Sequence, residues 1–226
     1  MVTRDIISQV FRIVIGTSGG TAITIEQNGA QFLITAKHLL EDLNYPANST
    51  IKLLSNGAYQ PYNVEIRYPT STTIDIAVMK LNPYQQIAPF YDTPKTTNGL
   101  TIGQDVYFLG FPYDYDNLLQ TIPLCNSPMP FVKKACMSSI IKLNNDDILL
   151  LLDGHNNHGF SGGPVCFGSS ESQPMRIAAV ISGYRHNRQP IVDGNDNPLQ
   201  YYWKENTGII NAYSIKHAID VIENWV

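Results

Sequence analysis

The hydrophobic positions of this chain fall in short runs of β-branched and aromatic residues that are separated by polar turns. Runs of this length and composition are typical of β-strands. In the first half of the chain we expect strands at residues 11–15, 21–26, 31–35, 51–54, 64–68 and 74–80. Asn28-Gly29, which lies between two of these runs, favours a tight hairpin turn. Residues 36–43 are expected to form one helical turn.

The second half repeats this pattern after residues 82–98, a stretch with three prolines that is typical of a linker. Strands are expected there at residues 105–110, 131–142, 148–152, 163–167, 175–182 and 207–211, with a turn at residues 193–198. Two groups of short strands favour paired β-barrels or a β-sandwich. We therefore predict an all-β fold with two domains, residues 1–95 and residues 96–226.

The end of the chain follows a different period. Its apolar residues recur at helical spacing over residues 213–226, which predicts a C-terminal helix with one apolar face, formed by Ile215, Ala218, Ile219, Ile222 and Trp225. Ser214 precedes this stripe and is expected to cap the helix, because a serine oxygen can accept a hydrogen bond from the first turn.

Composition narrows the possible functions. Hydrophobic residues make up 43% of the 226 residues and charged residues 15%, which is typical of a globular protein. The net charge of −4 shows no basic excess, so we expect no nucleic-acid partner. No apolar run is long enough to span a membrane. The first residues do not resemble a signal peptide, which favours a cytoplasmic location.

The three cysteines, Cys125, Cys136 and Cys166, are too few and too irregularly spaced to predict a disulfide framework. They include no CxxC pair, so a structural zinc site is not expected. Cys166 lies in an apolar stretch and is expected in the core. The sequence predicts no metal and no cofactor.

Three segments carry residues suited to nucleophilic catalysis. Ser161 is surrounded by glycines in the segment 159–163, and glycines permit the tight turn that exposes a nucleophilic hydroxyl. His38 follows an apolar strand and a small-residue turn. Asp75 stands at the start of an otherwise apolar predicted strand, where a carboxylate needs hydrogen-bonding partners. Each segment alone also fits a structural role, as a glycine-rich turn, a structural histidine or a strand-edge aspartate.

Together the three segments resemble the chymotrypsin-like (trypsin-fold) serine proteases, whose chain order is also histidine, aspartate, serine. The resemblance implies two six-stranded antiparallel barrels, with His38 and Asp75 in the first and Ser161 in the second. It makes Ser161 the nucleophile, His38 the general base and Asp75 the residue that orients the base. The backbone N–H groups of Gly159 and Ser161 would form the oxyanion hole. The closing segment 208–212 and the terminal helix look like the bacterial HtrA-like branch.

The same resemblance implies where a substrate binds. Ser182, Gly183 and Tyr184 would pair with the backbone of a peptide or protein substrate. Family spacing places His155, Asn156 and Tyr184 at the pocket for the residue before the scissile bond. No aspartate occupies the expected pocket floor, so a preference for lysine or arginine is not expected, whereas His155 would favour an acidic or amide side chain. His155 and His158 also fit the simpler role of solvated loop residues.

One departure from the digestive members of this family concerns activation. Those enzymes carry an aspartate before the nucleophile, which pairs with a newly formed N-terminal ammonium. This chain has Phe160 there, so we expect no activation by that route. The bulky Phe160 also keeps a second function open, a catalytically weak or inactive peptide-binding module of the same fold. Two further alternatives are an esterase with the same chemistry and a protease domain from a larger protein.

Overall fold

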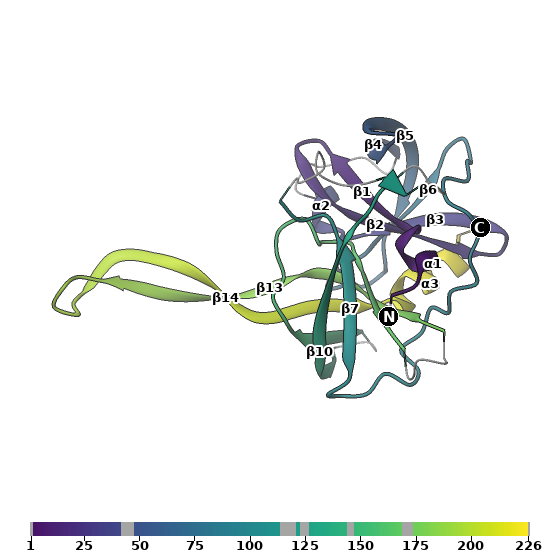
Figure 1. Cartoon of the computed structure of the whole chain (residues 1–226). Helices are drawn as coiled ribbons and strands as arrows, with labels where there is room; N and C mark the ends of the chain where they lie inside the picture. Colours follow the sequence, from purple (N-terminus) through teal and green to yellow (C-terminus); the bar gives the residue numbers. More distant parts are fainter. Residues whose placement is uncertain are drawn as a thin grey trace.

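The computed structural model describes residues 2–41, 48–113, 121–122, 127–143, 147–168 and 174–225, and it shows two closed antiparallel barrels (Figure 1). The first barrel has the strand order β1-β2-β3-β6-β5-β4. Its strands are β1 (Val10–Ile15), β2 (Ser18–Gln27), β3 (Ala30–Thr35), β4 (Asn48–Ser55), β5 (Ala58–Arg67) and β6 (Ala77–Leu81).

The second barrel has the strand order β10-β11-β14-β13-β12-β7. Its strands are β7 (Asp105–Gly110), β10 (Phe131–Lys142), β11 (Ile148–Asp153), β12 (Pro164–Phe167), β13 (Arg176–Val192) and β14 (Pro198–Ser214). Two short strands, β8 (Thr121–Ile122) and β9 (Ser127–Pro128), pair outside the barrels. The predicted all-β fold of two six-stranded barrels is confirmed. The predicted boundary at residues 95 and 96 falls in the segment that joins β6 to β7 and stays a prediction.

The apolar runs of the sequence are continuous because many strands are buried on both faces. In β3, Leu33 points into the first barrel while Phe32 and Ile34 join a cluster between the two barrels. In β13, Ile181 lies inside the second barrel and Val180 joins the same cluster between the barrels. Each barrel therefore has its own core, and a third core holds the two barrels together.

Two Asn-Gly turns in the first barrel adopt the backbone conformation that this residue pair favours. Asn28 and Gly29 have φ of 53° and 73°, and they join β2 to β3 through the Gln27–Ala30 pair. Asn56 and Gly57 have φ of 52° and 73°. Both central residues of a type I′ turn need positive φ, which asparagine and glycine adopt most readily. These turns fix the register of two hairpins in the first barrel.

The residues that the structure describes also form three short helices: α1 (Arg4–Ile7), α2 (His38–Glu41) and α3 (Lys216–Glu223). The C-terminal segment crosses from the second barrel to the first, where Trp225 contacts Phe32 with ring centroids 5.4 Å apart. The predicted cap is corrected: Ile215 is the N-cap residue and makes no side-chain cap bond. Ser214 instead ends β14, although its Oγ still accepts a hydrogen bond from Lys216 N at 3.3 Å. In the described part of the chain, no helix has the length and apolar character needed to cross a bilayer.

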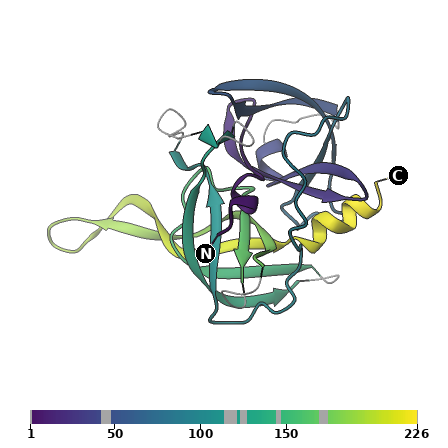
Figure 2. The same ribbon diagram turned by 45° about the vertical axis from the view of Figure 1, so that its right-hand side comes forward.

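Strand lengths differ from the prediction at two places. Strand β6 begins at Ala77 rather than residue 74, because its partner β3 ends at Thr35, which pairs with Ala77. Strand β13 continues to Val192, far beyond its predicted end, and β14 begins at Pro198, far before its predicted start. These extensions form an arm that projects from the second barrel (Figures 1 and 2). The arm residues are exposed on both faces, so they lack the apolar alternation by which a sequence reveals a strand. Cys166 is buried as expected, and Cys125 lies outside the described residues.

A buried histidine in α3 predicts how stability depends on pH. His217 is 7% exposed, and its Nε2 accepts a hydrogen bond from Ile148 N at 3.0 Å, which requires this nitrogen to be unprotonated. Burial lowers the pKa of His217, against the charges of Asp147 and Asp220, while Lys216 lowers it further. The unfolded chain therefore binds this proton more readily than the folded one, and stability falls as pH drops below about 6.5.

We expect His217→Gln to reduce this pH dependence, because glutamine carries no titrating proton and its side-chain oxygen can accept from Ile148. Urea midpoints measured at pH 7.5 and 5.5 for both proteins test this. Groups that titrate elsewhere affect the two proteins alike, so the difference between them isolates His217. An equal loss of stability in both proteins would contradict the assignment.

Candidate active site

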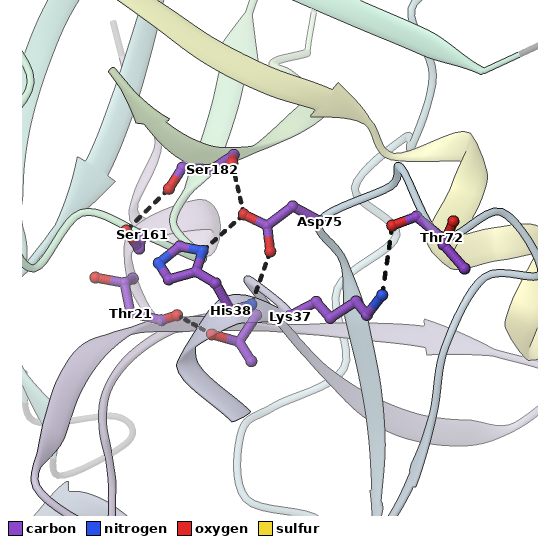
Figure 3. A network of polar contacts seen from close by, with 8 residues as sticks. Thr21, Lys37, His38, Thr72, Asp75, Ser161 and Ser182 are labelled. Atoms are coloured by element: carbon purple, nitrogen blue, oxygen red, sulfur yellow. Dashed lines mark hydrogen bonds and ion pairs between the residues drawn. The ribbon is translucent and has the colours of Figure 1, made fainter. Parts of the chain in front are cut away.

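His38 and Asp75 meet at one end of the first barrel. His38 begins α2, immediately after β3 and a short turn, and Asp75 lies in the extended segment that leads into β6. Asp75 Oδ2 is 2.7 Å from His38 Nδ1, and Asp75 Oδ1 accepts a hydrogen bond from the His38 backbone N at 2.8 Å. The carboxylate therefore holds both the ring and the backbone of the same histidine (Figure 3).

The Asp75 carboxylate is kept ionised by its partners. Burial alone would raise its pKa, but the hydrogen bonds and charge of His38, together with the hydrogen bond from Ser182, outweigh burial and hold the pKa of Asp75 below its ordinary value. Ser182 Oγ donates to Asp75 Oδ2 at 2.5 Å. The His38 side chain is 40% exposed and that of Asp75 is 18% exposed, so the ring faces solvent while the carboxylate lies behind it.

Ser161 comes from the second barrel and lies beside the imidazole of His38 (Figure 3). It occupies a tight turn before β12, in which Gly163 N donates to Phe160 O at 2.8 Å. The next residue, Gly162, has φ of 85°, and a Cβ there would lie 2.0 Å from Thr21 O. Only glycine fits this position. The Ser161 hydroxyl donates to the backbone oxygen of Ser182 at 3.0 Å.

The peptide between His158 and Gly159, just before the Ser161 turn, is held in one orientation. The His158 carbonyl accepts a hydrogen bond from Tyr113 N at 3.2 Å, and in a trans peptide the following N–H points the opposite way. The Gly159 N–H therefore points away from Tyr113. Gly159 has φ of 99°, and a Cβ on it would lie 2.1 Å from Phe111 O. Neither Gly159 N nor Ser161 N donates a hydrogen bond within the described part of the chain.

A residue that the sequence did not single out, Thr21 of β2, joins the two barrels at this turn. Its backbone N donates to Ser161 O at 2.8 Å, and its Oγ1 donates to Gly159 O at 2.7 Å. The same Oγ1 accepts a hydrogen bond from Phe111 N at 3.2 Å. No local motif marks this threonine, because its partners lie far away in the sequence. Thr21 thus anchors the residues on both sides of Phe160.

For the peptidase activity that the resemblance of the sequence implies, we expect Thr21→Val to lower kcat about tenfold or more, because the Gly159 carbonyl loses its anchor and the buried Phe111 N–H loses its acceptor. Thr24→Val is a matched control: Thr24 lies on the same strand and is equally buried, but its Oγ1 donates to Gln9 O, next to β1, and not to the turn that carries Ser161. Peptide hydrolysis and thermal unfolding are measured for both variants. Equal losses of kcat would show that Thr21 has only a structural role.

A shallow pocket of about 310 Å³ lies beside these residues. Of the residues predicted to bind substrate, it includes Asn156, Ser182, Gly183 and Tyr184, and it also reaches both His38 and Ser161. His155 lies outside this lining, where its side chain is exposed and its carbonyl accepts a hydrogen bond from Lys133. The lining also contains four residues outside the predicted set: Asn157, His158, His186 and Asn211. A larger hollow of about 610 Å³ lies beside α3, away from His38 and Ser161.

Phe160 does not obstruct the pocket. Its side chain is fully buried in the core of the second barrel, where it meets Phe108 edge-on with ring centroids 5.0 Å apart. Lys133 Nζ lies 5.3 Å from the centre of the Phe160 ring. The residue before Ser161 is therefore held by apolar packing. In the described part of the chain, histidine, cysteine and carboxylate side chains form no cluster of three or more that could hold a metal.

Comparisons with known proteins agree with this geometry. Among solved structures, the chain is similar to the inactive form of the Rv3671c protease of M. tuberculosis, with a TM-score of 0.58 and 13% identity over 97% of this chain and 89% of that one. It is also similar to the HtrA-type protease AlgW with a tripeptide, with a TM-score of 0.59 and 16% identity over 97% of this chain and 60% of that one. A third similar structure is that of Deg5, with a TM-score of 0.54 and 18% identity over 79% of this chain and 81% of that one.

These identities show a shared fold. No curated protein sequence matches the chain. The model of the trypsin-like peptidase domain, however, matches residues 20–171, which is more than half of the chain and includes His38, Asp75 and Ser161. The two barrels and this match lead to one conclusion: the chain belongs to the trypsin-like peptidase family, within the chymotrypsin fold.

Proposed function

We propose that this protein is a serine endopeptidase that hydrolyses peptide bonds through an acyl-enzyme on Ser161. The observation that carries the proposal is the pair of hydrogen bonds from His38 to the Asp75 carboxylate, with the Ser161 hydroxyl beside the same imidazole. In this arrangement the hydroxyl is the nucleophile and the imidazole is the general base. The carboxylate stabilises the positive charge that the imidazole gains.

In the proposed reaction, His38 Nε2 takes the proton of Ser161 as Oγ attacks the scissile carbonyl. Asp75 holds the proton on Nδ1, so that Nε2 is free to accept, and it stabilises the imidazolium that forms. His38 then donates the proton to the departing amine, which leaves an ester on Ser161. Water attacks this ester with His38 again as the base, and Ser161 recovers its proton as the acid product leaves.

Two backbone groups are proposed as the oxyanion hole, the N–H of Gly159 and the N–H of Ser161. Support comes from the bond that turns the His158 carbonyl toward Tyr113 and from the lack of intramolecular acceptors for either N–H in the described part of the chain. Donors that are already oriented stabilise the developing negative charge without reorganisation. This favours an enzyme over the alternative of an inactive binding module, in which a misdirected peptide would block the hole.

The Ser182 carbonyl links binding to activation of the nucleophile. It accepts the Ser161 hydroxyl in this structure. A substrate strand that pairs with Ser182 and Tyr184 brings its own N–H to this carbonyl. The Ser161 hydroxyl then exchanges its acceptor for His38 Nε2. The substrate is thus an extended peptide segment, and its binding places the hydroxyl for attack.

Labelling with a fluorophosphonate probe tests the nucleophile. The probe forms a covalent bond only with an activated hydroxyl, so the wild type is expected to label at Ser161, as located by mass spectrometry of the modified peptide. Ser161→Ala should not label. Ser138→Ala is the control, since Ser138 is exposed and its Oγ donates to the neighbouring Cys136 carbonyl. Equal labelling of Ser161→Ala and the wild type would remove Ser161 from this role.

A further inference from the structure

The arm formed by β13 and β14 extends the edge at which a substrate is proposed to bind. Beyond the barrel the two strands pair from His186 and Asn206 to Val192 and Pro198. Figures 1 and 2 both show this arm projecting alone from the second barrel. Its side chains are largely exposed, including Tyr201 at 70%. A projection of this length contributes little to the core.

Strand β13 loses its second neighbour at the active site. Its pairing with β12 ends at the Pro164–Val180 pair, followed by hydrogen bonds between Ile181 and the Gly162–Gly163 turn. From Ser182 onward, no strand in the described part of the chain pairs with this side of β13. An open strand edge therefore begins beside Ser161 and continues along the arm. Open edges offer unpaired N–H and C=O groups to another extended chain.

One contact and one residue type indicate which residues of β13 face this open edge. The Arg185 carbonyl accepts a hydrogen bond from Thr207 Oγ1, so it points toward β14. Pro190 lies on β13 and has no N–H, which suits a position that faces away from the ladder. The pairing shifts register between Tyr184 and His186, but the extra residues, 207–209, lie on β14, so alternation along β13 continues across the shift. The even-numbered residues Tyr184, His186 and Arg188 therefore face the open edge.

The pocket beside Ser161 already reaches the arm. Its lining runs from His38 and Ser161 through Tyr184 to His186. The His186 ring meets the Tyr184 ring edge-on, with centroids 4.7 Å apart, so the two side chains form one continuous wall. The base of the arm is thus part of the same groove as the candidate active site.

We propose that the open edge of the arm binds the stretch of substrate that precedes the active site, so that the enzyme acts on long unfolded polypeptide segments. This inference rests on the proposed function, and it goes beyond the pairing at Ser182 and Tyr184. In an antiparallel ladder, moving two residues along β13 moves the paired position two residues along the substrate. If Tyr184 faces the third residue before the scissile bond, His186 faces the fifth and Arg188 the seventh. Pro190 has no backbone N–H to donate to the ninth residue before the scissile bond, so the ladder ends there.

Peptides of graded length test the proposal. The bond cut fastest in β-casein, an unfolded protein, supplies the parent sequence, and peptides are made with four, six, eight and ten residues before that bond. We expect kcat/KM to rise roughly tenfold from four to six residues and again from six to eight, because each step adds a pair of backbone hydrogen bonds. It should not rise from eight to ten. Equal rates at all four lengths would overturn the proposal.

Methylated peptides identify the hydrogen bonds. A methyl group on the backbone nitrogen of the fifth residue before the bond removes a donor that faces His186, and it should abolish the first gain. The same methyl group on the sixth residue, whose nitrogen faces away from the arm, should leave most of that gain. Equal losses at both positions would show that backbone pairing with the arm is not the cause.

A pair of proline variants provides the matched control in the protein. Arg188 and Lys204 lie opposite each other in the arm, and their N–H groups face its two different open edges. Arg188→Pro should remove the gain from six to eight residues while leaving cleavage of the shortest peptide unchanged. Lys204→Pro should keep that gain. If both variants lost the gain from six to eight residues equally, the cause would be distortion of the arm, and the proposal would be overturned.

Binding by the inactive variant separates this proposal from the proposed function. Ser161→Ala is combined with each proline substitution, and the Kd for whole β-casein is measured by interferometry. Weaker binding only with Arg188→Pro supports the arm even if the wild type cuts no peptide, in which case the proposed function alone fails. Equal Kd values for the two combinations oppose the arm's role. A dimer in sedimentation that only Arg188→Pro disrupts would assign this edge to a second copy of the chain instead.

Discussion

Replacing Ser161 by alanine is expected to lower kcat for peptide hydrolysis by roughly a millionfold, while KM changes little. In the proposed mechanism the hydroxyl forms the acyl-enzyme, so its loss removes the whole covalent route and leaves only the contribution of binding and of the proposed oxyanion hole. The substitution removes one oxygen and its hydrogen bond to Ser182 O, and the surrounding turn keeps its glycines and its contacts with Thr21. The measurement is the initial rate on a quenched fluorescent peptide.

The control for this variant is its folding. Thermal unfolding of Ser161→Ala should follow that of the wild type within a few degrees, because no buried apolar contact is lost. A variant that folds normally and retains more than about a hundredth of the wild-type kcat would be incompatible with an acyl-enzyme on Ser161.

Replacing Asp75 by asparagine is expected to lower kcat about 10⁴-fold. Asp75 accepts three hydrogen bonds, two from His38 and one from Ser182. If the amide oxygen keeps the His38 backbone N–H, the amide nitrogen faces the ring nitrogen Nδ1 and can only donate to it. The proton of the neutral imidazole then moves to Nε2, which can no longer accept the proton of Ser161. Rates measured from pH 5 to 10 test this, since the loss should persist at every pH.

Ser182→Ala is the matched control for the carboxylate. It removes one of the three hydrogen bonds to Asp75 but leaves both bonds from His38, so a loss of about tenfold or less is expected. If Ser182→Ala and Asp75→Asn lost activity equally, the carboxylate would act mainly through Ser182, and its assigned action on the tautomer of His38 would be wrong.

The parts of the fold that the sequence predicted are those buried on both sides or marked by turn chemistry. The runs around Phe108 and Val180 are apolar because they serve two cores, and Asn28-Gly29 adopts the positive φ that its turn needs. The site segments could be found for a similar reason. A carboxylate in an apolar run and a serine among glycines are costly or conspicuous, and the structure brings Asp75 to His38 and Ser161 to the same imidazole.

The parts that escaped prediction depend on contacts with distant residues. The start of β6 is set by the end of β3, and the arm is held only by pairing between β13 and β14, with no buried face to mark it. In the sequence Thr21 looks like any threonine of a strand. Only the structure shows that it donates hydrogen bonds to Gly159 and Ser161. The prediction for His155 used family spacing. Spacing alone cannot show that the pocket lining includes His186 and does not include His155.

The packing of Phe160 determines which signals the catalytic turn can sense. Its ring is buried against Phe108, and its one charged neighbour described above is the Lys133 ammonium, so Phe160 offers no carboxylate that could form an ionic latch at this turn. An ammonium at a newly formed chain end would find no carboxylate to pair with at this residue. For the proposed protease, we therefore expect control through the supply of unfolded chain to the groove rather than through a charge at this turn.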